Sequence, residues 1–130
     1  MKSLQPPGWP RPKGYSNGMA ARGRIIVTAG VVGWDEQERF ASDRIADQFA
    51  QALRNILTIL ACDGADASRI ARLTCYVTSI DEYLESAKDI GAAWREIMGK
   101  HYPAMALVEV VRLVEHQAKV EIEAMAVVPE

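Results

Sequence analysis

The fold is decided by two neighbouring stretches, DRIADQFAQALRNILTILA (Asp43–Ala61) and IARLTCYVT (Ile70–Thr78). In the first stretch apolar residues recur every three or four positions, which is the spacing of a helix with one apolar face. In the second, Leu73, Cys75 and Val77 alternate with mostly polar residues, which is the spacing of a half-buried strand. A helix and a strand of this kind predict a layer of helices on one face of a sheet.

The sequence contains start and stop signals for two helices. Ser42 or Asp43 is expected to cap the first helix, and Gly64 lies just beyond its end. A second amphipathic helix is expected over Asp81–Lys100, where Ser79 precedes the start and Gly99 marks the end. Both helices have a single apolar face, so we expect them side by side on one side of the sheet.

Strands are expected at both ends of the chain. A short strand over Tyr15–Ala21 and a longer one over Arg24–Val32 would form a hairpin that turns at Arg22-Gly23. The chain closes with a pair of strands, Met105–Leu113 and Lys119–Val128, which a polar connection joins. The sequence therefore predicts an α+β domain with the order β-β-α-β-α-β-β and a mixed sheet.

This single domain would span residues 1–130, with residues 1–14 as an N-terminal arm. Four prolines and two glycines among these fourteen residues deny the backbone helix and ladder hydrogen bonds. Trp9 within the arm is a candidate lid residue over a binding site.

One face of the predicted sheet has no cover within the chain. It carries small and branched apolar residues that are too many to face water, namely Ala106, Val108, Val110 and Ala124. We therefore expect an oligomer that buries the open sheet face.

The composition excludes several classes of protein. With 15 basic and 17 acidic residues spread along the chain, the net charge is −2 and no basic face is available to neutralise phosphates, so no nucleic-acid partner is expected. No apolar run approaches the roughly 20 residues of a membrane span. Cys62 and Cys75 lack the spacing of a metal site or a disulfide scaffold. We expect a cytoplasmic protein with reduced thiols, no metal and no cofactor.

No standard catalytic motif is present, so the candidates are polar residues near strand ends. Glu121 and Glu123 share one face of the last strand because side chains alternate along a strand. One interpretation is that these glutamates face water and pair with Arg72, Arg112 or Lys119. The other is that Glu121 lies in a cleft between subunits and accepts a proton from a water that attacks an electrophilic carbon.

Six short segments follow one another in the order and spacing of the RidA/YjgF family, also labelled the endoribonuclease L-PSP family. They are Gly14-Tyr15-Ser16-Asn17, Ile26–Gly30, Gln48 with Asn55, Leu73–Val77, Pro103-Ala104 and Val120–Ala124. The sequence resembles this family over almost its whole length. The resemblance implies a chorismate-mutase-like fold and a homotrimer whose sheets pack around a central barrel, with small-molecule sites in the clefts between subunits.

The resemblance also assigns roles to single residues. In the deaminases of this family an arginine after the proline-alanine pair holds the substrate carboxylate, whereas this chain has Met105, whose thioether cannot. The water-holding glutamate corresponds to Glu121 and the cleft tyrosine to Tyr15. An alternative for Met105 is that it fills the core at the start of a strand.

Two further departures from the family also remove polar groups. The usual serine-glycine-glutamine is Ala29-Gly30-Val31 here, and an asparagine near the start of the second helix is replaced around Ala87 or Lys88. With Trp34 at the rim, such a cleft should prefer a more apolar ligand than a short imino acid. The candidate site therefore comprises Glu121 as the catalytic residue and a set of binding residues: Tyr15, Ala29, Gly30, Val31, Trp34 and Met105.

The leading hypothesis is a homotrimer that binds a small, mostly apolar carbonyl, enamine or imine metabolite and hydrolyses it with a water held by Glu121, without being a standard 2-imino acid deaminase. The alternative is a non-catalytic ligand-binding or chaperone-like trimer. A weaker alternative is a ribonuclease or translation inhibitor, labels that family members carry. Gln48 and Asn55 are expected to hold loop or strand-edge carbonyls, Arg112 to pair with a carboxylate, and Trp94 to lie in the core.

Overall fold

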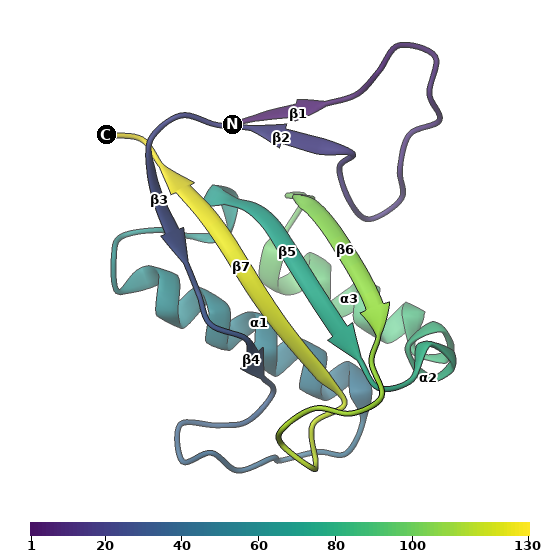
Figure 1. The fold of residues 1–130 in the computed structure, drawn as a ribbon. Helices are drawn as coiled ribbons and strands as arrows, with labels where there is room; N and C mark the ends of the chain where they lie inside the picture. The colour runs from purple at the N-terminus through teal and green to yellow at the C-terminus, as the bar shows by residue number, and fades with distance from the viewer.

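A five-stranded mixed sheet carries the helices on one face in the computed structural model, which describes residues 1–130 (Figure 1). In chain order the elements are β1 (Lys2–Leu4), β2 (Gly18–Ala20), β3 (Arg24–Val27), β4 (Val31–Val32), α1 (Ile45–Ala61), a 3₁₀ turn (Ala67–Arg69), β5 (Ile70–Val77), α2 (Ile80–Glu85), α3 (Ala87–Met98), β6 (Ala104–Glu109) and β7 (Val120–Val128). The predicted α+β class is confirmed. No helix is both long and apolar enough to cross a membrane.

Strand β7 lies in the middle of the sheet (Figure 1). It pairs antiparallel with β5 on one side and with β3 and β4 on the other, while β6 pairs parallel with β5 at the edge. The last two strands were expected to be neighbours, and this is wrong because β5 separates them. The helices between β5 and β6 return the chain to the starting end of β5, so β6 joins β5 in parallel.

The strand expected over Arg24–Val32 is two shorter strands, β3 and β4. Thr28 lies at the break, and its backbone N–H donates to the carbonyl of Ala124. The Thr28 hydroxyl accepts a hydrogen bond from the N–H of Ala124 at 3.0 Å. A side-chain oxygen thus takes the place of a backbone carbonyl in the ladder, which interrupts the strand while keeping both halves on β7.

The expected hairpin between Tyr15–Ala21 and Arg24–Val32 does not form. Instead β2 pairs with β1 in a separate two-stranded sheet beside the main one (Figure 1). Residues 2–4 precede the first proline, Pro6, so their backbone remains free to pair. The N-terminal arm is therefore not without ladder hydrogen bonds.

The start of the first helix and the continuity of the second differ from expectation. Helix α1 begins at Ile45 after Arg44, which offers no side-chain cap, and the Ser42 hydroxyl instead accepts from the N–H of Arg44. The helix expected over Asp81–Lys100 is two helices, because the chain turns at Ser86 between α2 and α3. Ser79 does cap α2 by accepting a hydrogen bond from the N–H of Glu82 at 3.1 Å.

The C-terminal ends of the helices lie where the glycines predicted them. Gly64 and Gly99 have φ angles of 76° and 66°, in the left-handed region that glycine tolerates best. Helix α1 ends at Ala61 and α3 at Met98, just before these glycines.

A core of 19 buried residues lies between α1, α3 and the facing side of β5 and β7. Leu73, Cys75 and Val77 lie in it, as the alternation in β5 predicts, and Trp94 joins them. Ala124 is also in this core, so its expected place on the open face is wrong. The shift follows from the register of β7, whose even-numbered residues 120–126 all face the helices.

The opposite face of the sheet remains uncovered within the chain. It carries four exposed apolar side chains, Ile25, Val27, Val108 and Met125. Pairing of Val27 with Met125 and of Tyr76 with Val108 places them on the same side as the polar residues of β5 and β7. The predicted apolar open face is thus confirmed for Val108.

Candidate functional site

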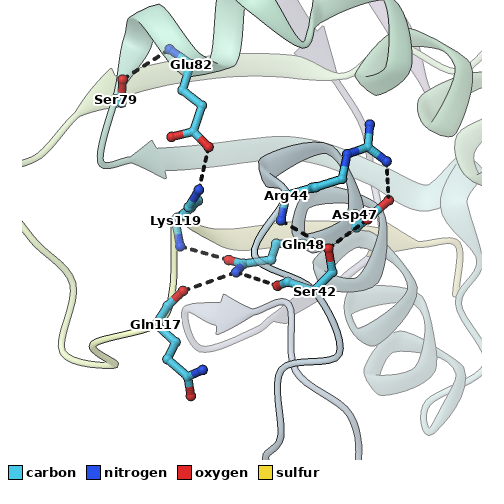
Figure 2. Close-up of polar contacts among 8 residues, drawn as sticks. All are labelled: Ser42, Arg44, Asp47, Gln48, Ser79, Glu82, Gln117 and Lys119. Atoms are coloured by element: carbon cyan, nitrogen blue, oxygen red, sulfur yellow. Dashed lines mark hydrogen bonds and ion pairs between the residues drawn. The ribbon is translucent and has the colours of Figure 1, made fainter.

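Gln48 of α1 attaches the helix layer to the start of β7 (Figure 2). Its side chain is 1% exposed, and the amide nitrogen donates to the carbonyls of Ser42 at 3.0 Å and Gln117 at 3.1 Å. The amide oxygen accepts from the N–H of Lys119 at 2.8 Å. The expected role of Gln48 in holding loop carbonyls is confirmed, and these bonds fix the backbone two residues before Glu121.

Asn55, two turns further along α1, holds the other strand beside Glu121. Its amide nitrogen donates to the carbonyls of Val32 at 3.1 Å and Trp34 at 2.8 Å, as expected. Gly33, between these two residues, passes so close to α1 that a Cβ there would lie 2.2 Å from the carbonyl oxygen of Gln48. The segment that carries Val31 and Trp34 is therefore held firmly against the helix.

Glu121 lies against the backbone at Gly30. A Cβ at position 30 would be 2.4 Å from the Oε2 atom of Glu121, so the carboxylate occupies the space that a side chain would fill. The carboxylate is partly buried and makes no hydrogen bond or ion pair within the chain. It opens into a groove of about 870 Å³ that Gly30, Val31 and Trp34 also line.

The groove around Glu121 is acidic rather than basic. Besides Glu121 it is lined by four acidic residues and by the single basic residue Arg54; the acidic residues are Asp35, Glu36, Glu38 and Glu115. The Arg54 guanidinium pairs with Glu96 of α3 rather than with Glu121.

Tyr76 of β5 lies beside the two glutamates of the open face and was not singled out from the sequence. It is the register partner of Glu121, and its hydroxyl donates to the Oε1 atom of Glu123 at 2.5 Å. This hydrogen bond, with burial and the negative charge of the glutamates, raises the pKa of Tyr76, so the phenol stays a donor. The alternation of β5 places Tyr76 on the open face, but only the pairing with β7 identifies its partner.

Neither glutamate pairs with the cations that the first interpretation offered. Lys119 pairs with Glu82 at 2.6 Å, and Arg72 and Arg112 make no ion pair. The expected pairing of Arg112 is therefore wrong. Arg112 lies past the end of β6, in the connection to β7, where its side chain extends into water.

Met105 lies on the other side of the sheet. In β6 it is the register partner of buried Leu73, and its sulfur is 3.9 Å from the sulfur of Cys75. It packs against the core and also borders a pocket of about 270 Å³, which Ala87 lines as well. Within one chain, Met105 and Glu121 are thus on opposite faces of the sheet.

Tyr15 lies on the β6 side of the molecule, away from Glu121. The neighbouring Ser16 donates from its backbone to the carbonyl of Pro103 and from its hydroxyl to the carbonyl of Tyr102. Tyr15 lines a separate small depression that Tyr102 shares. Trp9 is 60% exposed, and its suggested role as a lid stays a prediction.

The predicted site residues therefore form two groups. Glu121, Gly30, Val31 and Trp34 line one groove, and Ala29 precedes it in the chain without lining it. Met105 and Tyr15 lie at the opposite edge of the sheet in two adjacent depressions. A single cleft that contains both groups would have to be built from two copies of the chain.

Comparison with known proteins connects this arrangement with a family. The family model described as Endoribonuclease L-PSP matches residues 10–128. The 2-iminobutanoate/2-iminopropanoate deaminase of Escherichia coli strain K12 is 28% identical over 108 residues, which cover 81% of this chain and 80% of that protein.

Two solved structures have the same fold. A member of the YjgF/YER057c/UK114 family from Mycobacterium tuberculosis is 34% identical, with a TM-score of 0.67 and coverage of 88% of this chain and 87% of that one. Escherichia coli TdcF with bound serine is 25% identical, with a TM-score of 0.71 and coverage of 98% and 99%. The chain therefore belongs to the RidA/YjgF/YER057c/UK114 family, as a divergent member.

Proposed function

We propose that residues 1–130 form one domain of a homotrimer that binds a small, mostly apolar carbonyl, enamine or imine metabolite in clefts between subunits. We propose further that the trimer hydrolyses the imine form with a water held by Glu121. The observation that carries this proposal is the Glu121 carboxylate, which is partly buried against Gly30 and has no partner in its own chain. A partly buried carboxylate without a partner is a good candidate for a site residue.

The assembly is supported by the apolar open face of the sheet. Ile25 and Val27 are 63% and 66% exposed and lie two residues apart on the same face of an edge strand, and Met125 lies beside Val27. Each such side chain contributes roughly 1.5 to 3 kcal/mol when it is fully buried. Packing of the open faces against one another would bury this surface. Such packing agrees with the chorismate-mutase-like trimer that the family resemblance implies.

The chemistry needs one proton acceptor and one water. The imine reacts in its protonated form. The Glu121 carboxylate takes a proton from the water as the water oxygen bonds to the C=N carbon, and the nitrogen takes up the C=N electron pair and becomes an amine. Glu121 then returns the proton to this amine, the C–N bond breaks as the hydroxyl loses its proton to solvent, and ammonia and a carbonyl compound leave. An enamine enters the same route after it tautomerises to the imine. The balance is imine plus water to carbonyl plus ammonia, with no cofactor required.

The preference for an apolar ligand is supported by residues that line the pocket beside Met105 and the groove at Glu121. Met105 offers no hydrogen-bond donor where the deaminases of the family hold a carboxylate, and Ala87 beside it is equally apolar. Val31 and Trp34 line the groove of Glu121. Short 2-imino acids should therefore be poor substrates.

Ammonia release is the direct test. Purified protein is supplied with freshly generated 2-aminoacrylate and, separately, with imines that have larger apolar side chains. We expect slow turnover of 2-aminoacrylate, faster turnover of the apolar imines, and a loss of about 100-fold in Glu121→Gln. Rapid turnover of 2-aminoacrylate would contradict the assignment of Met105, and full activity in Glu121→Gln would contradict the proposed role of Glu121.

A non-catalytic ligand-binding or chaperone-like trimer is the second candidate. It is favoured by the absence of any hydrogen bond that would orient Glu121, since catalytic carboxylates are usually held by neighbours. In that case Glu121→Ala leaves ligand-induced thermal shifts unchanged and no imine releases ammonia above the rate in buffer.

Cleavage of RNA has the least support. The net charge is −2, and the charged side chains that line the groove at Glu121 are mainly acidic and repel phosphates. A salt-titrated RNA-binding measurement tests this option, and tight binding at physiological salt would revive it.

A further inference from the structure

A pocket with aromatic walls lies beside Met105, between α3 and the edge strand β6, and the proposed function draws only on Met105 and Ala87 of its lining. Its volume is about 270 Å³, and seven of its ten lining residues are hydrophobic. An apolar cavity of about 150 Å³ is large enough to bind benzene. The pocket beside Met105 thus has room for one aromatic ring and a short chain.

Two aromatic pairs form the walls of this pocket. Trp94 and Tyr102 stack with ring centroids 6.0 Å apart and an interplanar angle of 4°. Phe49 and Tyr83 approach at 6.2 Å with their rings tilted. Aromatic faces and edges of this kind bind a further ring by offset or tilted stacking, and the sulfur of Met105 adds a favourable contact to a ring.

Gly91 leaves the pocket open. It lies in the middle of α3, where glycine weakens a helix, and its φ angle is not in the left-handed region. A Cβ there would meet only the Nη1 atom of Arg95 at 3.5 Å, which is an ordinary contact. Neither the backbone nor a clash requires glycine at this position. What the missing side chain provides is space in the pocket.

Arg95 is the only charged residue among the ten that line the pocket. It follows Gly91 by one helical turn, so both lie on the same face of α3. Other arginines on the helix layer are paired, Arg44 with Asp89 and Arg54 with Glu96, whereas Arg95 makes no ion pair and no side-chain hydrogen bond. A guanidinium group matches a carboxylate with two parallel hydrogen bonds.

Besides Arg95, the polar side chains that line the pocket are two tyrosines. The hydroxyls of Tyr83 and Tyr102 make no hydrogen bond within the chain, although both rings line the pocket. Burial raises the pKa of Tyr83, which keeps its phenol protonated and able to donate. A ligand with an acceptor between its ring and its carboxylate would satisfy such a donor.

We infer that this pocket binds a small aromatic carboxylate, an aryl-substituted 2-oxo or 2-imino acid, with its ring between the aromatic walls and its carboxylate on Arg95. The inference rests on the proposed function only for the oxo or imino group of the ligand. It provides the carboxylate partner that Met105 cannot provide, from a different element of the same chain. A neutral ligand would leave the Arg95 guanidinium without an anionic partner.

Binding of phenylpyruvate to the full-length protein, measured by titration calorimetry, tests this inference. We expect phenylpyruvate to bind at least about tenfold more tightly than pyruvate, which lacks the ring, and than phenylacetone, which lacks the carboxylate. Arg95→Ala should weaken phenylpyruvate binding by about tenfold or more, and Arg95→Lys should restore part of the loss, because lysine keeps the charge without the fork. Gly91→Leu should abolish binding by filling the pocket while the fold remains stable.

The outcomes separate this inference from the proposed function. If phenylpyruvate fails to bind, or if Arg95→Ala and Gly91→Leu both leave its affinity unchanged, the inference is wrong whatever the protein does to imines. If binding depends on Arg95 but no imine releases ammonia, the proposed hydrolysis is wrong and the pocket assignment stands.

Discussion

Glu121 rests directly on the backbone of Gly30, where a Cβ would come within 2.4 Å of its Oε2 atom. Gly30→Ala should therefore displace the carboxylate and lower imine hydrolysis about tenfold or more, because a proton acceptor must lie within hydrogen-bond reach of its water. The measurement is kcat/KM for ammonia release. Adding the shorter carboxylate of Glu121→Asp to Gly30→Ala should restore part of the activity, and no effect of Gly30→Ala would show that Glu121 does not act from this position.

Gln48→Ala should lower the free energy of unfolding by about 2 to 4 kcal/mol, because it leaves two carbonyls and one N–H without their buried partner. Urea unfolding followed by circular dichroism measures the change. Gln117→Ala is the matched control, since only the backbone carbonyl of Gln117 takes part and its side chain points away from Gln48 (Figure 2). Equal losses in both variants would refute the assigned role of the Gln48 amide.

Val27→Glu should reduce the molar mass in solution from that of a trimer to that of a monomer. Val27 is 66% exposed in the single chain and lies beside Met125 on the open sheet face, so burial of a charge there would be costly. Size-exclusion chromatography with light scattering gives the mass. Leu84→Glu, at an exposed apolar position of α2, should leave the mass unchanged. A monomeric wild-type protein at micromolar concentration would rule out the proposed assembly.

Alkylation should distinguish the two free cysteines. Cys62 is exposed, whereas burial raises the pKa of the Cys75 thiol to about 12. At pH 8 iodoacetamide should therefore modify one thiol per folded chain and two in denaturant, as counted by mass spectrometry. Rapid double modification of the folded chain would show that Cys75 is not in a closed core.

The same thiol predicts a dependence of stability on pH. Because the folded pKa lies above the ordinary value of 9.0, the contribution of Cys75 is fully present below about pH 9 and is lost as the pH rises toward 12. The stability of Cys75→Ala should thus fall less steeply over this range than that of the wild type. Parallel slopes in urea unfolding experiments between pH 8 and 11 would contradict the burial of the thiol.

Several features could be predicted from the sequence because they depend on short stretches of chain. The alternation of Leu73, Cys75 and Val77 predicted the core face of β5, and Gly64 and Gly99 predicted where helices stop. The seven-residue separation of Gln48 and Asn55 predicted that both amides lie on one face of α1 and hold loop or strand-edge carbonyls, and each holds its own pair. In β5 and α1 the backbone period sets the direction of the side chains, and at the two glycines the left-handed φ angle ends the helix.

Other features depend on pairings between distant segments. The sequence suggested hairpins at Arg22-Gly23 and between the last two strands, but β2 pairs with β1, and β5 lies between β6 and β7. Short strands are compatible with several partners, and the choice depends on the packing of the whole sheet. Tyr76 was missed for this reason, since its relation to Glu121 and Glu123 exists only through the register of β5 and β7.

By itself the sequence determined the family resemblance, the α+β class, the two apolar helix faces and the identity of Met105 and Glu121, because all of these are properties of residues and of local periods. Only the tertiary structure decided that Met105 and Glu121 face opposite sides of the sheet, and that Gly91 and Arg95 border the pocket beside Met105. The physical reason is that a side chain's direction is local, whereas the surface it meets is built by segments that approach one another only in the folded chain.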